Sequence, residues 1–528
     1  MLHRSRSSLI YFIIGVAAAI SCMIYLRITL TDFDFKTSTG GALSPNAMTK
    51  PVIIVGSGLA GLSAAYEALK AGAQVHMLDR APKPGGNSIK ASSGINGAGT
   101  RFQRDKNITA DTSARFYEDS ARSAGARMLS HTGALGETER KALVEMLASQ
   151  SADAVHWLAD EIGVDLTTVA QLGGHSLART HRGTTGPPPG AAIVGALLKK
   201  LGADPRFTLT SSADVEALTV SEDGRVSGVR YTVDGGGETR ELQGAVVFAA
   251  GGFAGDAHGL LAQHRPDLAG MPSTNDARPA AHGLLADVGA AFVDMDSVQI
   301  HPTGFVDPKD PAATYKFLAA EALRGEGGIL LSAADGRRFL NEMERRDVAS
   351  DAIMALPPSA AADPGVRQWD VTLLLDPGAC EATGSHLGFY LFKGLMQKKK
   401  VKDLAPAVIE AVDRYAAAVA AGVDGDFGRA AFGHWRLPPG EANREEEVAV
   451  GIVTPVTHFT MGGVAFNTKA QVLGRKGDAL APIEGVWAAG EITGGVHGDN
   501  RLGGSSLLEC AIFGRIAGAE AAKSLSNV

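Results

Sequence analysis

The sequence lacks the residues on which several classes of protein depend. Only three cysteines occur among 528 residues, Cys22, Cys380 and Cys510, and no two of them form a C-x-x-C pair. A disulfide framework, an iron–sulfur cluster and c-type haem attachment therefore all lack their ligands. Basic residues are also too few to dominate, because 50 Lys and Arg against 57 Asp and Glu leave a net charge of -7. We therefore expect small-molecule ligands and no nucleic acid partner.

What the sequence does hold is a large apolar content and many glycines. Hydrophobic residues make up 45% of the chain, and 65 residues are glycine with no G-X-Y period, which excludes disorder and collagen. The length corresponds to two to four domains. We expect the extra glycines in turns and ligand-binding loops, and any redox chemistry must come from a bound organic cofactor.

One long hydrophobic run stands near the N-terminus. Residues 9–26 are 18 uncharged residues, enough for a helix that just spans a bilayer. We expect residues 1–28 to be a membrane anchor, with a cleaved signal peptide or a mitochondrial presequence as the alternatives. The polar residues 29–50 are typical of a linker. The expected location is the endoplasmic reticulum or the mitochondrion, and the sequence does not choose between them.

A strand, a glycine loop, a helix and a second strand follow one another after residue 51. The Gly56-x-Gly58-x-x-Gly61 spacing lets the backbone approach a pyrophosphate, which then lies on the positive end of the following helix. Asp79 closes the second strand, where a carboxylate accepts hydrogen bonds from a ribose. The expected contacts in the loop and first helical turn are Gly56, Gly58, Leu59, Ala60 and Gly61. A polar glycine-rich stretch at 84–97 and Gly490-Glu491 favour a larger ligand such as FAD over NAD.

The rest of the chain predicts a sheet assembled from both ends of the sequence. Periodicity predicts a helix over 142–162, an antiparallel meander over 208–248 that returns to the sheet, and a buried strand over 486–491. The fold class is α/β, with a Rossmann-like FAD-binding domain and an inserted α+β capping domain, preceded by the transmembrane helix. The expected boundaries are 51–295 and 459–528 for the FAD-binding domain and 296–458 for the capping domain.

Seven separated motifs carry a family resemblance over about residues 50–525. They are GSGLAG with Asp79, GGNSIKASSGING, VQIHPTG, AEALRGEGG, RRFLNEMERRDVAS, HFTMGG and GEITGGVHGDNRLGGSSL. Together they resemble the soluble fumarate reductases of the succinate dehydrogenase/fumarate reductase flavoprotein family. The resemblance implies reduction of fumarate to succinate by hydride transfer from reduced FAD, with protonation by an arginine. Respiratory relatives attach FAD through a histidine in the segment equivalent to 87–94, which has none here, so one noncovalent FAD per chain is expected.

The resemblance also implies a role for individual residues. Arg346 matches the proton donor, and Glu321 and Arg324 match a relay that reprotonates it. The residues that match the substrate clamps are His301, His458, Arg501 and Gly504, and we expect the two imidazoles to be charged. Those that add to the FAD site are Asn87, Ser88, Ser93, Glu491, Ser506 and Leu507. The electron donor that recharges the flavin is unidentified.

Other functions remain open at this point. Within the same family, the substrate could be another unsaturated acid such as urocanate, or a 3-oxosteroid. Three cationic clamps favour a dicarboxylate, because a substrate with one carboxylate leaves a clamp unpaired. In another class, the chain could be a flavin-binding membrane protein without catalysis, in which Arg346 is half of a surface ion pair with Asp347. An intact proton relay has no use in such a protein.

Overall fold

The structure is a computed structural model that describes residues 50–129, 135–360, 362–477 and 479–526. The predicted anchor over 1–28 and nearly all of the predicted linker lie outside the described residues. Within the described ranges, no helix combines the length and the apolar character needed to cross a bilayer.

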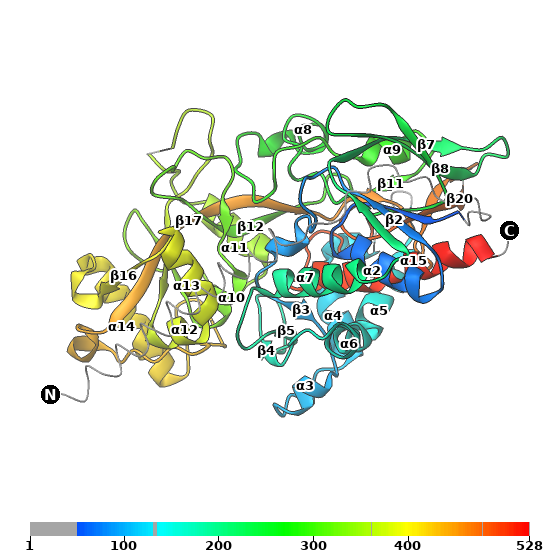
Figure 1. Cartoon of the computed structure of the whole chain (residues 1–528). Coiled ribbons are helices and arrows are strands. Elements are labelled where there is room, and N and C mark those ends of the chain that lie inside the picture. The colour runs from blue at the N-terminus through cyan, green and yellow to red at the C-terminus, as the bar shows by residue number, and fades with distance from the viewer. Residues whose placement is uncertain (1–49, 130–134, 361, 478, 527–528) are drawn as a thin grey trace.

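A six-stranded sheet, in the order β19-β20-β10-β1-β2-β6, forms the centre of one half of the molecule (Figure 1). The strands β20, β10, β1, β2 and β6 run parallel, and β19 is an antiparallel edge. Their bounds are β1 (Val52–Val55), β2 (Val75–Leu78), β6 (Phe207–Thr210), β10 (Ala245–Phe248), β19 (Gln471–Lys476) and β20 (Ala479–Ala488). The predicted Rossmann-like sheet, assembled from both ends of the chain, is confirmed.

The two faces of this sheet bury alternate residues. Ile54 and Met77 pack against helices, whereas Ile53 and Leu78 pack against a small antiparallel sheet. The helices are α2 (Leu59–Lys70), α7 (Pro189–Gly202) and α15 (Ser505–Ser526), and the small sheet is β7 (Ala213–Val220), β8 (Val226–Val233) and β9 (Arg240–Gln243). Helices α2 and α15 approach closely because α15 has glycines at the contact. A Cβ on Gly514 would lie 2.4 Å from the carbonyl oxygen of Ala60.

Two predicted elements differ from the structure. The predicted helix over 142–162 is divided into α5 (Glu137–Ser149), α6 (Ser151–Trp157) and a π turn, Leu158–Ile162. The Ser151 hydroxyl donates to the carbonyl of Ala148 and accepts from the Ala98 N–H, so it competes with regular helical bonding. The meander is also wrong in its first strand, because β6 pairs in parallel with β2 in the main sheet, and β9 completes the meander instead.

A second sheet of antiparallel strands lies between β10 and β20 in the sequence. Its order is β13-β12-β17-β15-β14, with β16 also paired to β17. The strands are β12 (Val298–Phe305), β13 (Phe317–Leu318), β14 (Ile329–Ser332), β15 (Val371–Leu375), β16 (Gln397–Lys400) and β17 (Glu447–Thr460). Its helices are α10 (Glu321–Gly325), α11 (Arg346–Met354), α12 (Pro377–Ala382), α13 (Gly384–Lys393) and α14 (Pro406–Ala421). An inserted antiparallel sheet is therefore present, whereas the domain boundaries stay a prediction.

Several further elements complete the fold (Figure 1). Short strands form a three-stranded sheet, β3 (Ile95–Asn96), β4 (Thr168–Ala170) and β5 (Thr180–Arg182), and a pair, β11 (Phe292–Val293) and β18 (Gly463–Val464). Short helices are α3 (Arg101–Arg104), α4 (Ser113–Ser123), α8 (Leu260–His264) and α9 (His282–Ala286). The long strand β17 runs from the second sheet back toward the main sheet, and the predicted site lies where it arrives.

Candidate active site

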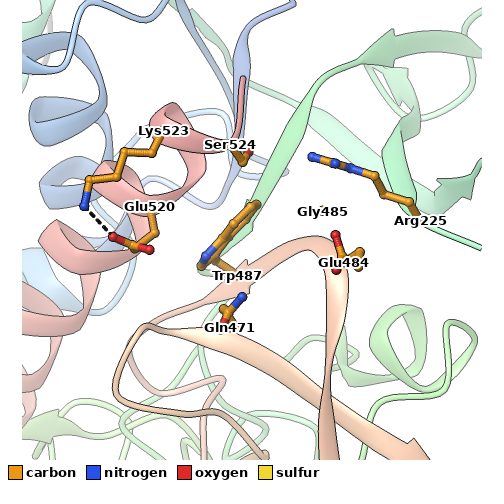
Figure 2. Close-up of a pocket in the computed structure, with 8 residues that line it drawn as sticks. All are labelled: Arg225, Gln471, Glu484, Gly485, Trp487, Glu520, Lys523 and Ser524. Atoms are coloured by element: carbon orange, nitrogen blue, oxygen red, sulfur yellow. Dashed lines mark hydrogen bonds and ion pairs between the residues drawn. The ribbon is translucent and has the colours of Figure 1, made fainter. Parts of the chain in front are cut away.

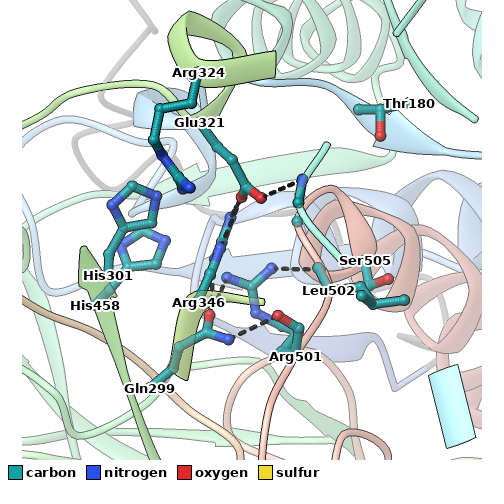
Figure 3. Close-up of polar contacts among 12 residues, drawn as sticks. Thr180, Gln299, His301, Glu321, Arg324, Arg346, His458, Arg501, Leu502 and Ser505 are labelled. Atoms are coloured by element: carbon teal, nitrogen blue, oxygen red, sulfur yellow. Dashed lines mark hydrogen bonds and ion pairs between the residues drawn. The ribbon is translucent and has the colours of Figure 1, made fainter. Parts of the chain in front are cut away.

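Five of the predicted site residues come together where the second sheet meets the loop before α15 (Figure 3). His301 lies on β12 and His458 on the neighbouring β17, and their ring centres are 5.2 Å apart. Glu321 is the first residue of α10, Arg346 is the first residue of α11, and Arg501 lies in the loop that follows β20. We call the cationic cage the set Gln299, His301, Glu321, Arg324, Arg346, His458 and Arg501.

Arg346 is bound to Glu321 inside this cage. Its Nε and Nη2 atoms donate to the Oε2 atom of Glu321 at 2.8 and 2.5 Å, and both side chains are almost fully buried. The other carboxylate oxygen of Glu321 accepts from the Gly173 N–H at 3.0 Å. Burial raises the pKa of Glu321, but the charges of Arg346 and Arg324 outweigh it and hold that pKa below its usual value. The pair is therefore a charged ion pair and not two neutral groups.

Gln299 joins the two arginines that the sequence analysis assigns to different roles. Its Oε1 atom accepts from Arg346 Nη1 at 2.7 Å and from Arg501 Nη2 at 3.0 Å. Its amide nitrogen donates to the carbonyl of Arg501 at 2.7 Å. Gln299 was not predicted from the sequence, although it stands two residues before His301 on the same strand, where alternate residues share a face.

Arg501 lies in an apolar and cationic environment. Its guanidinium is 4.3 Å from the centre of the Phe459 ring, and the residue is 2% exposed. Burial, followed by the nearby charge of Arg346, lowers the pKa of Arg501 to about 9. Arg501 therefore keeps its charge at neutral pH, and an anion beside it would relieve an unfavourable environment.

Arg324 completes the predicted relay only in part. It lies within range to act on Glu321 by its charge, but within the described residues no hydrogen bond joins the two side chains. Its Nη1 atom donates instead to the carbonyl of Glu342 at 2.7 Å. The Nε and Nη2 atoms of Arg324 are buried and have no partner among the residues described.

The two histidines are neutral in this structure, contrary to the expectation of charged imidazoles. Burial, followed by the charge of Arg346, lowers the pKa of both His301 and His458 well below its usual value. The Nδ1 atom of His458 bonds the Thr274 hydroxyl at 2.9 Å. The Nε2 atom of His301 is buried without a partner in the described part of the chain. The charge of the cage therefore comes from its arginines.

Two glycines of the loop before α15 lie against the cage. A Cβ on Gly503 would be 2.5 Å from the Oε2 atom of Glu321, so no side chain fits there. Gly504, predicted to bind substrate, has φ +82° and would place a Cβ 2.3 Å from the Oδ1 atom of Asn96. Both positions require glycine, for space and, at Gly504, for its left-handed backbone.

The glycine loop fits the pyrophosphate of a dinucleotide. A Cβ on Gly56 would lie 2.3 Å from the Ala249 carbonyl, and one on Gly61 would lie 2.0 Å from the Gly56 carbonyl. Gly58 precedes the first residue of α2 and supplies no side-chain cap. Leu59 and Ala60 point their side chains into the core, so only their backbone N–H groups face the loop. A helix N-terminus without a side-chain cap is a site for an anion.

Asp79, Ser88 and Asn87 border this loop. The Asp79 carboxylate accepts from the N–H groups of Ser57 and Ala81, both at 2.7 Å, and from the Ser57 hydroxyl. The hydroxyl of Ser88 accepts from the Leu59 N–H at 3.0 Å. The Asn87 amide donates to the side chain of Asn275. A ribose would therefore share the oxygens of Asp79 with the loop.

The remaining predicted cofactor residues lie between the glycine loop and the cage. Desolvation by the surrounding protein raises the pKa of Glu491 to about 7, and its carboxylate accepts from the Thr460 N–H at 3.0 Å. Ser506 and Leu507 belong to the first turn of α15, and the first N–H groups of a helix have no partner within the helix. Ser93 lies in the partly buried segment after Ser88. These donors and the crowded glycines fit FAD.

A cavity of about 350 Å³ lies away from the cage, between the end of α15, β20 and the β7–β8 turn (Figure 2). The residues that line it are Arg225, Gln471, Glu484, Gly485, Trp487, Glu520, Lys523 and Ser524. Lys523 pairs with Glu520 at 2.7 Å, and Arg225 and Glu484 supply one further charge of each sign. Its lining contains no residue of the predicted site, and its mixed charges select no class of ligand.

Comparison with known proteins assigns the family. Residues 51–507 match the family described as FAD binding domain. Fumarate reductase 1 of Saccharomyces cerevisiae is 41% identical over 499 residues, which cover 90% of this chain and 98% of the yeast protein. This chain belongs to the fumarate reductase flavoprotein family.

Other members of the fumarate reductase flavoprotein family show the same extent of similarity. The fumarate reductase of Schizosaccharomyces pombe is 38% identical over 490 residues, covering 90% of this chain and 89% of that protein. Among solved structures, the open conformation of a flavocytochrome c3 fumarate reductase matches with a TM-score of 0.67 and 32% identity, covering 91% of this chain and 79% of that one. The α/β flavoprotein fold predicted from the sequence is thereby confirmed.

Proposed function

We propose that this chain is an FAD-dependent fumarate reductase that forms succinate. The observation that carries the proposal is the surplus of positive charge in the cationic cage. Among the described residues, only one carboxylate, that of Glu321, forms hydrogen bonds with any of the three buried arginines, and four buried nitrogens there have no partner. They are His301 Nε2, Arg324 Nε, Arg324 Nη2 and Arg501 Nε. A small dianion supplies both the charge and the acceptors that this arrangement needs.

The mechanism divides between cofactor and protein. Bound FAD in its reduced form supplies a hydride to one carbon of the substrate double bond. Arg501, His301 and His458 bind the carboxylates, and the charge of the dianion raises the pKa of both imidazoles toward protonation. The carboxylate next to the reacting carbons takes up the developing negative charge, which the cage stabilises.

Arg346 gives the second carbon its proton, so one hydride and one proton convert fumarate into succinate. Because an ordinary guanidinium has a pKa above 12, it must recover a proton at once. Glu321 is bonded to it and, with its low pKa, passes a proton on without keeping it. Arg324 supplies Glu321 only after it moves closer, since their side chains are not bonded in this structure.

The function is tested with residues 50–528 and the matching full-length chain. Wild-type protein should be yellow and should oxidise a reduced dye only when fumarate is present. The same assay with urocanate or a 3-oxosteroid examines the family alternatives, and we expect little turnover because each leaves a carboxylate clamp unpaired. A protein that binds FAD but reduces none of these three compounds would refute the proposal and favour a flavin-binding protein without catalysis.

The FAD is noncovalent, with one molecule per chain. No histidine occurs in the segment 87–94, and the segment offers hydroxyl and amide groups instead. Denaturation should release all the flavin into the filtrate, and absorbance should give a flavin-to-protein ratio near one. Flavin that stays with the denatured protein would contradict this part of the proposal.

The N-terminal segment anchors the enzyme in a membrane of the endoplasmic reticulum or the mitochondrion. The uncharged run at 9–26 and the basic residues before it support this assignment. Asn107, in the sequon Asn-Ile-Thr, is exposed and so is available to an oligosaccharide if the body lies in the lumen. A mobility shift after deglycosylation, lost in Asn107→Gln, would assign the endoplasmic reticulum. Release of the full chain by alkaline carbonate would refute the anchor.

A further inference from the structure

His175 is a buried histidine, 6% exposed, that touches the edge of the cage. It lies in the loop after β4, and its Nε2 atom is 3.0 Å from the carbonyl oxygen of Gly503. Its Nδ1 atom is 3.2 Å from Arg179 Nη1. In the same loop, the Gly173 N–H donates to Glu321. This loop therefore contacts both the glycine pair before α15 and the carboxylate that pairs with Arg346.

The neighbours of His175 fix its tautomer. A guanidinium has donors only, so Arg179 must donate and Nδ1 of His175 must accept. The proton of the neutral ring is then on Nε2, which donates to the Gly503 carbonyl. Arg179 is itself held by Asp111, with Nη2 to Oδ1 at 2.6 Å, and by Asp119, with Nη1 to Oδ2 at 2.6 Å. The buried ion network around Arg179, which lies outside the cage, therefore fixes the ring of His175 so that its Nε2–H donates to Gly503.

The Gly503 carbonyl accepts a second bond, from the side-chain amide of Asn96 at 2.8 Å. Asn96 is oriented by Thr180, whose hydroxyl donates to its Oδ1 atom at 2.7 Å. The peptide that follows is planar and trans, so the N–H of Gly504 points away from the two donors. That N–H has no hydrogen-bond partner among the described residues. Two donors on one peptide carbonyl also strengthen the N–H of that peptide as a donor.

We propose that His175 and Asn96 are positioning residues that aim the Gly504 N–H at a carboxylate of the substrate. This inference rests on the proposed function. It states that His175 and Asn96 orient the Gly504 N–H, which is an uncharged donor next to the charged groups that bind the substrate. A side chain that only filled space at position 175 would need no polar atoms. Both ring nitrogens of the buried His175 form hydrogen bonds, which indicates that its orientation matters. Neither residue touches the reacting atoms.

The experiment compares two replacements of His175 in the flavin-loaded enzyme. His175→Gln keeps an N–H group near the position of Nε2, whereas His175→Leu keeps the volume and removes the donor. The matched control is His181→Leu, because His181, on β5, is also buried and bonds Thr100 and the Arg179 carbonyl but not Gly503. Turnover and KM for fumarate are measured per bound FAD, so that loss of folded protein does not count.

We expect His175→Leu to lower kcat/KM by about 10–100-fold per bound FAD, as removal of a supporting hydrogen bond does at other sites. His175→Gln should recover most of that loss, and His181→Leu should stay within about threefold of wild type. The pH profile of His175→Gln should keep its shape between pH 5.5 and 9, because burial, followed by the charge of Arg179, lowers the pKa of His175 to about 4.

The inference is overturned if His175→Leu and His181→Leu have the same kcat/KM per bound FAD, or if His175→Gln is no better than His175→Leu. Neither result would affect the proposed function, which depends on wild-type turnover. An inactive wild type, in contrast, would remove the proposed function, whatever the variants did.

Discussion

Two clusters of buried arginines in the described part of the chain differ in how fully their charges are matched. In the cationic cage, Glu321 is the one described carboxylate that forms a hydrogen bond with Arg346, Arg501 or Arg324. In a second cluster, beneath β14, Arg338 and Arg429 meet Glu342 and Asp424. We call this second set the balanced cluster. Its two positive and two negative charges cancel, whereas the cage keeps a positive surplus.

The same difference appears in the pKa values. Burial lowers the pKa of Arg324 and Arg501 in the cage. Burial also opposes the charge of Arg338, but hydrogen bonds to Glu342 and Asp424 outweigh it and raise its pKa above the usual value. Buried charges are therefore stabilised in the balanced cluster and left unsatisfied in the cage. An enzyme keeps such unsatisfied groups where a ligand completes them, so the contrast separates the site from the framework.

The largest expected effect is on Arg346. Arg346→Ala removes the acid and should lower fumarate turnover by about 10²–10⁴-fold, the range for loss of a general acid, while the yellow flavin stays bound. The measurement is fumarate-dependent dye oxidation per bound FAD. Its neighbour Arg345 pairs with Asp347 near the surface, so Arg345→Ala is the control and should stay within about threefold of wild type. Equal effects at both positions would remove the distinction between cage and framework.

Substitutions in the balanced cluster should lower the unfolding free energy of the protein and leave its turnover of fumarate unchanged. Glu342→Gln leaves two buried guanidiniums without their shared carboxylate and should cost about 3–5 kcal/mol of unfolding free energy. Glu445 pairs with Lys400 and Lys402 on the surface, where solvent screens the charges, so Glu445→Gln should leave the unfolding free energy almost unchanged. Urea unfolding measures both. If Glu342→Gln lowered kcat per bound FAD but left the unfolding free energy unchanged, the balanced cluster would belong to the site.

Gln299 sharpens the comparison, because it is the neutral group that holds two cage arginines together. Gln299→Leu removes the acceptor they share, so Arg346 and Arg501 should separate and kcat/KM for fumarate should fall by about 10–100-fold. The matched control is Gln103→Leu, which removes a buried amide bonded to Asp111 and the Ala178 carbonyl, outside the cage. A loss of kcat/KM no greater than that of Gln103→Leu would show that the arginines need no bridge.

The smallest effect concerns a carboxylate that lacks a bonded arginine, Glu491. Its folded pKa of about 7 lies above the ordinary value, so the folded protein holds a proton that the unfolded chain loses. Stability contributed by this proton is full at low pH and is lost as pH rises toward 7. Between pH 5 and 8, the thermal midpoint of the flavin-free wild type should therefore fall by roughly 2–4 °C more than that of flavin-free Glu491→Gln. A difference that does not change with pH would contradict the raised pKa.

Local patterns were sufficient to predict the glycine loop and the parallel sheet. The sequence from β1 to Asp79 has a strand period, a glycine spacing and a helix period within about thirty residues. The prediction was wrong for β6, because its partner β2 lies more than a hundred residues earlier and a short edge strand looks alike in either sheet. The interruption of the predicted helix at Ser151 was also not foreseen, because it is caused by a contact with Ala98, which is distant in the sequence.

The site was predicted to the extent that family motifs name its residues. His301, Glu321, Arg346, His458 and Arg501 do come together, but Gln299 and His175 join them through contacts with residues far away in the sequence. The expected charge on the histidines was wrong because the charge depends on burial and on Arg346, and neither is visible in a motif. The missing bond between Arg324 and Glu321 is likewise a matter of side-chain placement.

The packing of α15 against α2 has a consequence for synthesis of the protein. Helix α2 follows the glycine loop, and its partner α15 lies more than four hundred residues later in the sequence. The glycine face that lets the two helices touch, and the first turn that adds donors to the flavin site, are therefore synthesised after the other elements of the site. A growing chain has no finished cradle before α15 is made, and we expect cofactor uptake to follow the synthesis of α15.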